Sequence, residues 1–146
     1  MDKRSFLRLT LAGSSLGLFV PKAVFAALTE SPLKSKLAGG MFFTEQALGR
    51  WNKGTASHHL PQLEKQTTGG KTQLHVAAAH PMDGLDHFIV KHQLLDQDLK
   101  FLQEHLFKPT VDKKPEFIFD LGNHKGVVYA ISVCNVHDMW VNMIEV

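Results

Sequence analysis

The chain has 146 residues and a mass of 16.3 kDa, which is the size of a single domain. Hydrophobic residues make up 44% and charged residues 21%, which excludes a disordered or collagen-like chain. A single cysteine excludes an intramolecular disulfide and any four-thiolate metal site within one chain. Nine histidines beside that cysteine raise the expectation of a metal site.

Residues 1–26 have the pattern of an export signal. Basic residues at Lys3, Arg4 and Arg8 precede an apolar stretch over 7–20, and small residues lead to a cleavage point after Ala26. This stretch is shorter than the roughly 20 residues of a membrane-spanning helix, so stable membrane insertion is not expected. Lys3-Arg4 resembles the start of a twin-arginine motif, and a Sec signal is the alternative. Both predict a periplasmic protein.

The formal net charge of +2 at pH 7 belongs mostly to this signal. Without residues 1–26 the chain carries 12 Lys and Arg against 13 Asp and Glu, a formal charge of −1. Binding to nucleic acid depends on a basic surface, so no nucleic-acid partner is expected.

The remaining 120 residues divide into an arm and a β domain. Residues 27–56 contain four glycines and a proline, which predict an irregular arm with one helical turn around 44–48. Residues 57–146 form the predicted domain. Its short segments of β type cover 71–79, 88–95, 99–107, 117–121, 127–133 and 139–146. Five to seven strands at about ten-residue spacing predict an all-β sandwich.

The strongest chemical motif is Cys134-Asn135-Val136-His137. A thiol and an imidazole three residues apart, directly after an apolar strand, can face one metal ion. A free cysteine is often only a small buried hydrophobe. In an exported protein, however, an unoccupied thiol is open to oxidation, and the nearby histidine favours a metal.

Two further segments carry histidines. His80 and His87 flank a loop that contains Pro81 and Gly84, and a loop of this length can present both rings to one centre. The third segment is Ser57-His58-His59-Leu60-Pro61. Each segment alone is compatible with solvated histidines. Together the three segments supply five nitrogen and sulfur ligands, which indicates one metal site.

The chain resembles the superoxide reductases, the neelaredoxin and desulfoferrodoxin group. The resemblance spans about residues 51–140 and rests on Trp51, His59-Leu60-Pro61, His80-Pro81-Met82, His87-Phe88-Ile89 and Cys134-Asn135-Val136-His137-Asp138-Met139-Trp140. It implies an immunoglobulin-like β-sandwich of about seven strands. The one cysteine leaves no ligands for the additional four-cysteine iron domain of desulfoferrodoxins, so the resemblance is to the one-iron type.

The resemblance also implies the site and its chemistry. His59, His80, His87 and His137 would be equatorial ligands of one iron ion, and Cys134 its axial thiolate. The sixth position would stay open for superoxide, which is reduced to hydrogen peroxide. An electron donor that the sequence does not identify would then reduce the ferric ion. The sequence leaves the oligomeric state open and allows a homo-oligomer.

The sequence departs from the family's pattern at three places. Ser57-His58 stands where Glu-Lys is usual, so His58 is the candidate for the lysine's catalytic role of attracting superoxide. A histidine side chain, however, is mostly neutral at pH 7. His80 and His87 are seven positions apart rather than six. Asp138 stands where glycine is usual and places an anion beside the site.

Two other functions compete with a superoxide reductase. An exported copper carrier of the cupredoxin type would use Cys134, His137, a methionine and one upstream histidine. It would leave the other upstream histidines without a role. A noncatalytic iron-binding accessory domain would keep the ligands and lack the superoxide chemistry.

Overall fold

The computed structural model describes residues 34–146. The predicted export signal, 1–26, and the first residues of the predicted arm, 27–33, lie outside the described residues. Within residues 34–146, no helix is both long enough and apolar enough to cross a membrane.

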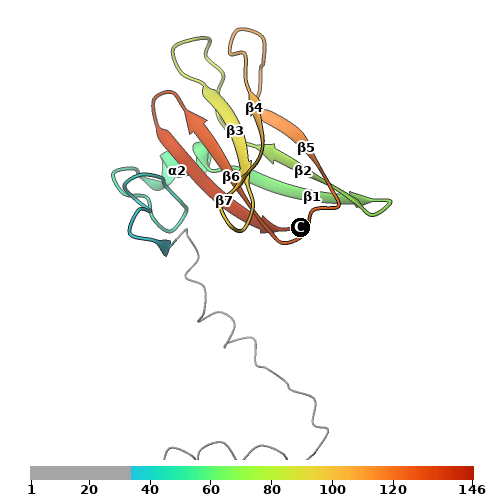
Figure 1. Ribbon diagram of the computed structural model, residues 1–146. Helices are drawn as coiled ribbons and strands as arrows, with labels where there is room; N and C mark the ends of the chain where they lie inside the picture. The colour runs from blue at the N-terminus through green and yellow to red at the C-terminus, as the bar shows by residue number, and fades with distance from the viewer. Residues whose placement is uncertain (1–33) are drawn as a thin grey trace, which may run out of the picture. The chain divides into compact units, whose positions relative to one another are not determined.

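Seven antiparallel strands form two sheets (Figure 1). The three-stranded sheet has the order β1-β2-β5, with strands Gln62–Thr68, Lys71–Ala77 and Glu116–Gly122. The four-stranded sheet has the order β4-β3-β6-β7, with strands Phe101–Leu106, Ile89–Leu95, Val127–Cys134 and Asp138–Glu145. The predicted all-β sandwich is confirmed.

The core follows from the alternation of apolar side chains along the strands. Successive side chains of a strand point to opposite faces, so every second residue faces the other sheet. The largest buried cluster accordingly takes alternate residues from four strands: Leu74, Val76, Leu94, Phe119, Leu121, Val128 and Ala130. The strands predicted from this alternation are present, with bounds that differ by up to two residues.

Strand β1 was not predicted from the sequence. It pairs with β2 along its whole length, from Gln62 opposite Ala77 to Thr68 opposite Lys71. Leu63 is its only partly buried residue, and the other six are exposed. An edge strand of this kind has almost no apolar alternation, so its sequence resembles a polar loop.

The seven-residue helix α2, Lys53–His59, stands where the sequence indicated a loop. Asn52 caps its N-terminus, since the Asn52 side chain accepts a hydrogen bond from the Thr55 N–H at 2.9 Å. Ala56 and His59 are the buried residues of the helix. The helix therefore presents one histidine to the interior and keeps its neighbour outside.

The described part of the arm packs along β7. Phe43 pairs with Trp140 in a parallel bridge, donating to the Met139 carbonyl and accepting from the Val141 N–H at 2.8 Å each. The predicted helical turn around 44–48 is wrong. Thr44 and Ala47 instead close a tight turn through reciprocal backbone hydrogen bonds of 3.2 Å. This turn leads the chain back toward α2.

Candidate metal centre

Five side chains bring their donor atoms together at one end of the sandwich. The donor atoms lie within 4.8 Å of one another and belong to His59, His80, His87, Cys134 and His137. The side chains come from the end of α2, the loop between β2 and β3, the last residue of β6, and the loop between β6 and β7 (Figure 1). These are the five residues that the sequence predicted as ligands.

The spacing of the donor atoms fits one metal ion. His137 Nδ1 lies 3.1 Å from His59 Nε2 and 2.9 Å from His87 Nε2. His87 Nε2 lies 2.9 Å from His80 Nε2. Cys134 Sγ lies 3.6 Å from His137 Nδ1 and 3.7 Å from His80 Nε2. Two imidazole nitrogens at right angles around an ion, each about 2.1 Å from it, lie about 3.0 Å apart.

Two of the rings have a fixed tautomer. His59 Nδ1 lies 2.7 Å from the Thr55 carbonyl oxygen, and His80 Nδ1 hydrogen-bonds to the Pro81 carbonyl oxygen. A carbonyl oxygen only accepts, so both Nδ1 atoms carry the proton and both Nε2 atoms carry a lone pair. Both Nε2 lone pairs lie within the cluster of donor atoms, where they are available to a cation. The donor set therefore fits a metal ion.

Burial lowers the pKa of three of the cluster's imidazoles. For His59, burial together with the neighbouring His80, His137 and His87 rings lowers the pKa to about 4. Burial also lowers the pKa of His80 and of His137, with His87 as an additional cause in both. Burial raises the pKa of the Cys134 thiol. Neutral imidazole is the form that binds metals, and a coordinating metal deprotonates a thiol.

Helix α2 decides which of the two adjacent histidines joins the cluster. His59 follows Ala56 by three residues and shares its buried face, with 3% of its surface exposed. His58 is exposed, and its Nδ1 lies 2.9 Å from the Ala79 carbonyl oxygen. His58, predicted as a catalytic residue, thus lies beside the cluster but outside it.

The loop between β2 and β3 accommodates the additional residue between His80 and His87. A short bridge joins Asp83 to His87, and the Asp83 N–H donates to the His87 carbonyl oxygen at 3.0 Å. Gly84 turns the chain there with φ +60°, a backbone conformation that favours glycine. This turn brings the chain back on itself, and both histidines reach the cluster.

Asn135 ties two of the ligand-bearing segments together, and the sequence analysis assigned it no role. Its Nδ2 donates to the Asp86 carbonyl oxygen at 3.0 Å, and its Oδ1 accepts from the Phe88 N–H at 2.9 Å. Its place between Cys134 and His137 was the one signal in the sequence. The Asn135 side chain fixes the loop that carries His87 against the loop that carries His137.

Aromatic side chains surround His137. The Trp140 Nε1–H donates to the His137 carbonyl oxygen at 2.7 Å, and Trp140 itself is fully buried. The Trp51 ring meets the His137 ring edge-on, with centroids 5.0 Å apart. Asp138, expected to place an anion beside the site, forms an ion pair of 2.6 Å with Arg50.

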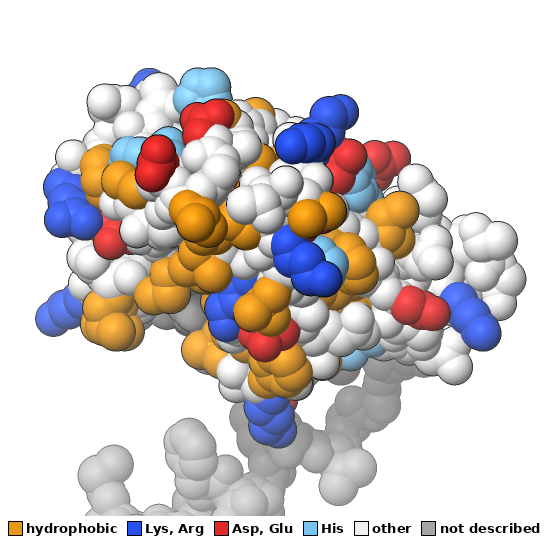
Figure 2. All heavy atoms as spheres, turned by 90° about the horizontal axis from the view of Figure 1, so that it is seen from above, with side chains coloured by type: hydrophobic (Ala, Val, Ile, Leu, Met, Phe, Trp, Pro, Cys, Tyr) orange, Lys and Arg blue, Asp and Glu red, His pale blue; other side chains and the backbone are white. Residues whose placement is uncertain are grey.

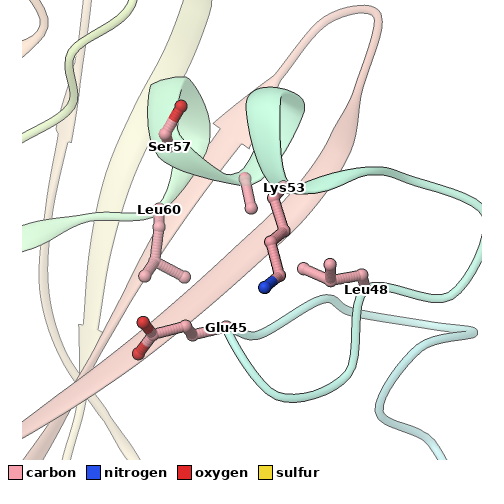
Figure 3. Close-up of a pocket in the computed structure, with 6 residues that line it drawn as sticks. Glu45, Leu48, Lys53, Ser57 and Leu60 are labelled. Carbon is pink, nitrogen blue, oxygen red and sulfur yellow. The ribbon is translucent and has the colours of Figure 1, made fainter.

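A separate small pocket lies on another side of α2. Figure 3 shows Lys53 from the helix and Glu45 from the arm pointing into it, and Leu48, Ala56, Ser57 and Leu60 complete its lining. None of the five cluster residues lines this pocket, so it is not part of the metal centre. On the face of the molecule that Figure 2 shows, hydrophobic, acidic, basic and histidine side chains are interspersed.

Comparison with known proteins points to one family. Residues 51–143 match the family model of desulfoferrodoxin. The structure is similar to a superoxide reductase (neelaredoxin) from Ignicoccus hospitalis, with 24% identity and a TM-score of 0.61 over 74% of this chain and 95% of that one. A superoxide reductase from Nanoarchaeum equitans gives 20% identity and a TM-score of 0.55 over 62% and 94%.

A third structure, of a superoxide reductase in the oxidised state, shares 26% identity with this chain. Its TM-score is 0.51, over 60% of this chain and 87% of that one. No curated protein matches the sequence.

Proposed function

Because the chain belongs to the desulfoferrodoxin family, we propose that it is a superoxide reductase with one mononuclear non-haem iron centre. The observation that carries this function is the convergence of four imidazole nitrogens and one cysteine sulfur. When bound, a ferrous ion supplies the one electron that, with two protons, converts superoxide to hydrogen peroxide, and an external donor then restores the ferrous state. We assign the metal to His59, His80, His87, Cys134 and His137.

The chain's own residues prepare these donors. The Thr55 and Pro81 carbonyl oxygens accept hydrogen bonds from the Nδ1–H groups of His59 and His80. These bonds orient both rings and make their Nε2 atoms more basic. The Val136 N–H donates to Cys134 Sγ at 3.4 Å and stabilises negative charge on the sulfur. An anionic sulfur ligand raises the electron density available for reduction. The five donors are one short of the six that an octahedral ion takes, which leaves a position for substrate.

His58 is the proposed residue for attracting the superoxide anion. Its ring is exposed and lies close enough to the neighbouring His80 to lower the pKa of that ring. Its Nδ1–H donates to the Ala79 carbonyl oxygen, which ties the exposed ring to the segment just before His80. Nε2 is left for solvent, and it donates to an approaching anion in the protonated form of the ring.

The donor set argues against a copper carrier. Blue-copper centres combine one cysteine with two histidines and a weak axial ligand. Here four imidazoles converge, so the two upstream histidines that a copper carrier would leave without a role belong to the cluster as well. The other alternative, a noncatalytic accessory domain, would have the same ligands as a superoxide reductase. The two differ only in whether superoxide is consumed.

One experiment tests the proposed function. The chain is loaded anaerobically with Fe(II), its metal content is measured, and it is then exposed to superoxide in the presence of a reductant. A reductase forms one hydrogen peroxide per superoxide and releases no oxygen, whereas a dismutase forms one peroxide per two superoxides and releases oxygen. His75→Gln, a histidine on β2 outside the cluster, serves as the control and should behave as wild type. Iron binding without superoxide consumption would leave the accessory domain as the function.

Location and electron supply are also proposed. The sequence of residues 1–26 supports export to the periplasm, where superoxide and an electron donor must both reach the protein. The donor must transfer one electron per superoxide, so the protein takes part in an electron-transport chain.

A further inference from the structure

The backbone of Asp138 is in a conformation that favours glycine. Asp138 follows His137 directly and begins β7 opposite Cys134. Its φ is +66°, in the left-handed region that disfavours residues with a Cβ atom, although aspartate tolerates it better than most. Glycine would fit this position without strain.

The Asp138 carboxylate receives two donors from the arm. Its Oδ2 accepts from Arg50 Nη2 at 2.6 Å and from Trp51 Nε1 at 3.1 Å. The Arg50 guanidinium also lies over the Trp51 ring, 4.7 Å from its centroid. The side chains of Arg50 and Asp138 are 65% and 33% exposed, so the ion pair itself contributes little to stability.

The same arrangement reaches His137 through Trp51. The two rings meet edge-on with centroids 5.0 Å apart. The ring of His137 makes no hydrogen bond outside the metal cluster in the described part of the chain, unlike His59 and His80 with their carbonyl partners. The Trp51 ring orients the His137 ring by packing against it instead of by a hydrogen bond. The hydrogen bond from Trp51 Nε1–H to Asp138 sets the angle of the indole.

The charges of Arg50 and Asp138 oppose each other beside the site. Both act on the His137 ring, with opposite signs. An unpaired carboxylate next to the cluster would favour the more positive, oxidised metal and would repel an anionic substrate. An unpaired guanidinium would have the reverse effect. Paired, the two groups leave the field at His137 nearly unchanged.

We propose that Arg50, Trp51 and Asp138 form a clamp, in which Asp138 positions the His137 ring through Trp51 while Arg50 cancels the charge of Asp138. These three are positioning residues, and their role rests on the proposed function only for the identity of the metal. The clamp sets the affinity for the metal through Trp51. It sets the reduction potential of the bound metal through the balance between the charges of Arg50 and Asp138.

The positioning part is tested by metal affinity. Metal-free protein is titrated with Co²⁺, and the bound ion is followed by its absorption. Trp51→Leu removes both the ring edge and the N–H, and we expect Co²⁺ affinity to fall 10- to 100-fold, the usual effect of losing a residue that orients a ligand. Asp138→Asn keeps an acceptor for Trp51, so its Co²⁺ affinity should stay within threefold of wild type. Equal affinities for wild type and Trp51→Leu would overturn the positioning role.

The charge part is tested by the midpoint potential of the iron-loaded protein. Arg50→Gln leaves Asp138 unpaired and should lower the potential, because negative charge stabilises the ferric ion. Asp138→Asn leaves Arg50 unpaired and should raise the potential. The double variant should return close to wild type. Shifts of the same sign in both single variants, or a double variant whose potential stays as far from wild type as that of a single variant, would overturn the charge balance.

A matched control lies at the opposite end of β3. Asp98 and Lys100 form an exposed ion pair at 3.8 Å in the turn between β3 and β4, so Asp98→Asn changes the net charge in the same way as Asp138→Asn. It should leave affinity and potential unchanged, and a shift equal to that of Asp138→Asn would also overturn the charge balance. Failure of the proposed function is a separate result: the wild type would then bind Co²⁺, with the Trp51→Leu difference intact, and consume no superoxide.

Discussion

His59 is oriented by a carbonyl oxygen of its own helix. Its Nδ1–H donates to the Thr55 carbonyl oxygen, one turn earlier in α2, at 2.7 Å. The helix backbone thus directs the Nε2 lone pair of His59 at the cluster. A change in the position of α2 must therefore change the position of the donor atom.

The N-cap of α2 tests this dependence. Asn52→Ala removes the acceptor of the Thr55 N–H and should lower the free energy of unfolding by about 1 kcal/mol. A seven-residue helix has few hydrogen bonds of its own. Loss of the cap should therefore loosen the helix that carries His59, and we also expect weaker metal binding. Urea denaturation and Co²⁺ titration of the metal-free protein measure the two effects. Asn52→Asp keeps a capping acceptor and should preserve both, and unchanged metal affinity in Asn52→Ala would show that α2 holds His59 without its cap.

Cys134 should determine the colour of the oxidised protein. Cys134→Ser replaces the sulfur with an oxygen and should remove the sulfur-to-iron charge-transfer absorption while the fold is kept. The absorption spectrum of the ferric protein measures this, with His75→Gln as the control that leaves all five donors in place. An unchanged spectrum in Cys134→Ser would mean that the sulfur is not a ligand.

Much of the fold and the ligand set could be predicted because both depend on patterns among residues that are close in the sequence. The buried residues of β2 and β5 follow a period of two, and that period is visible in the sequence. The cysteine motif keeps two donors within three residues. Each such feature needs only neighbouring residues for its recognition.

The features that escaped prediction depend on tertiary contacts. Strand β1 has one partly buried residue and exists because it pairs with β2. Helix α2 contains a glycine and two histidines, which are poor helix formers, and Asn52 and the packing of Ala56 compensate. The contact between Arg50 and Asp138 joins residues 88 positions apart. No pattern among neighbouring residues predicts a contact between positions so far apart in the sequence.

His58 should affect the capture of superoxide and not the binding of iron. His58→Lys places a permanent positive charge beside His59 and should raise the second-order rate of superoxide consumption several-fold at neutral pH. The increase should shrink at high ionic strength, because exposed charges are screened. His58→Gln serves as the neutral control and should keep the wild-type iron spectrum. Loss of iron in that control would mean that His58, rather than His59, binds the metal.

Export tests the sequence of residues 1–26. Replacing Lys3 and Arg4 by Gln should leave precursor in the cytoplasm, as judged by cell fractionation, whereas Lys22→Gln in the same segment should export normally. A protein whose metal site forms from distant segments acquires its metal only when folded, which favours the pathway that carries folded proteins. Normal export of the Lys3 and Arg4 variant in cells without the twin-arginine translocase would identify the signal as a Sec signal.

A buried histidine outside the metal centre, His92, should make stability depend on pH. His92 has no exposed surface and lies in β3. Its Nε2–H donates to the Pro115 carbonyl oxygen at 2.9 Å, and its Nδ1 accepts from the Ser132 hydroxyl at 2.9 Å. The first bond joins the four-stranded sheet to the segment that leads into β5, and the second joins β3 to β6 within that sheet. The bond from Ser132 requires the neutral ring, because a protonated Nδ1 cannot accept.

Burial, together with the neighbouring His105 and His75 rings, lowers the pKa of His92 to about 4. In the unfolded chain a histidine has a pKa of about 6.5. Below that pH, His92 is therefore protonated in the unfolded state while it stays neutral in the folded state. Stability from the neutral ring is therefore complete above pH 6.5 and is lost as the pH falls toward 4. A difference of roughly 2.5 pKa units corresponds to about 3 kcal/mol.

The comparison with His92→Gln isolates this contribution. Glutamine has no titratable group and keeps an N–H donor for the Pro115 carbonyl oxygen. We expect the variant to be less stable at pH 7, because the fit to Ser132 is lost, but to lose about 3 kcal/mol less between pH 6.5 and 4. Urea denaturation of the metal-free proteins across this range measures the difference, and the cluster histidines contribute equally to both. Parallel stability curves for the two proteins would contradict the depressed pKa of His92.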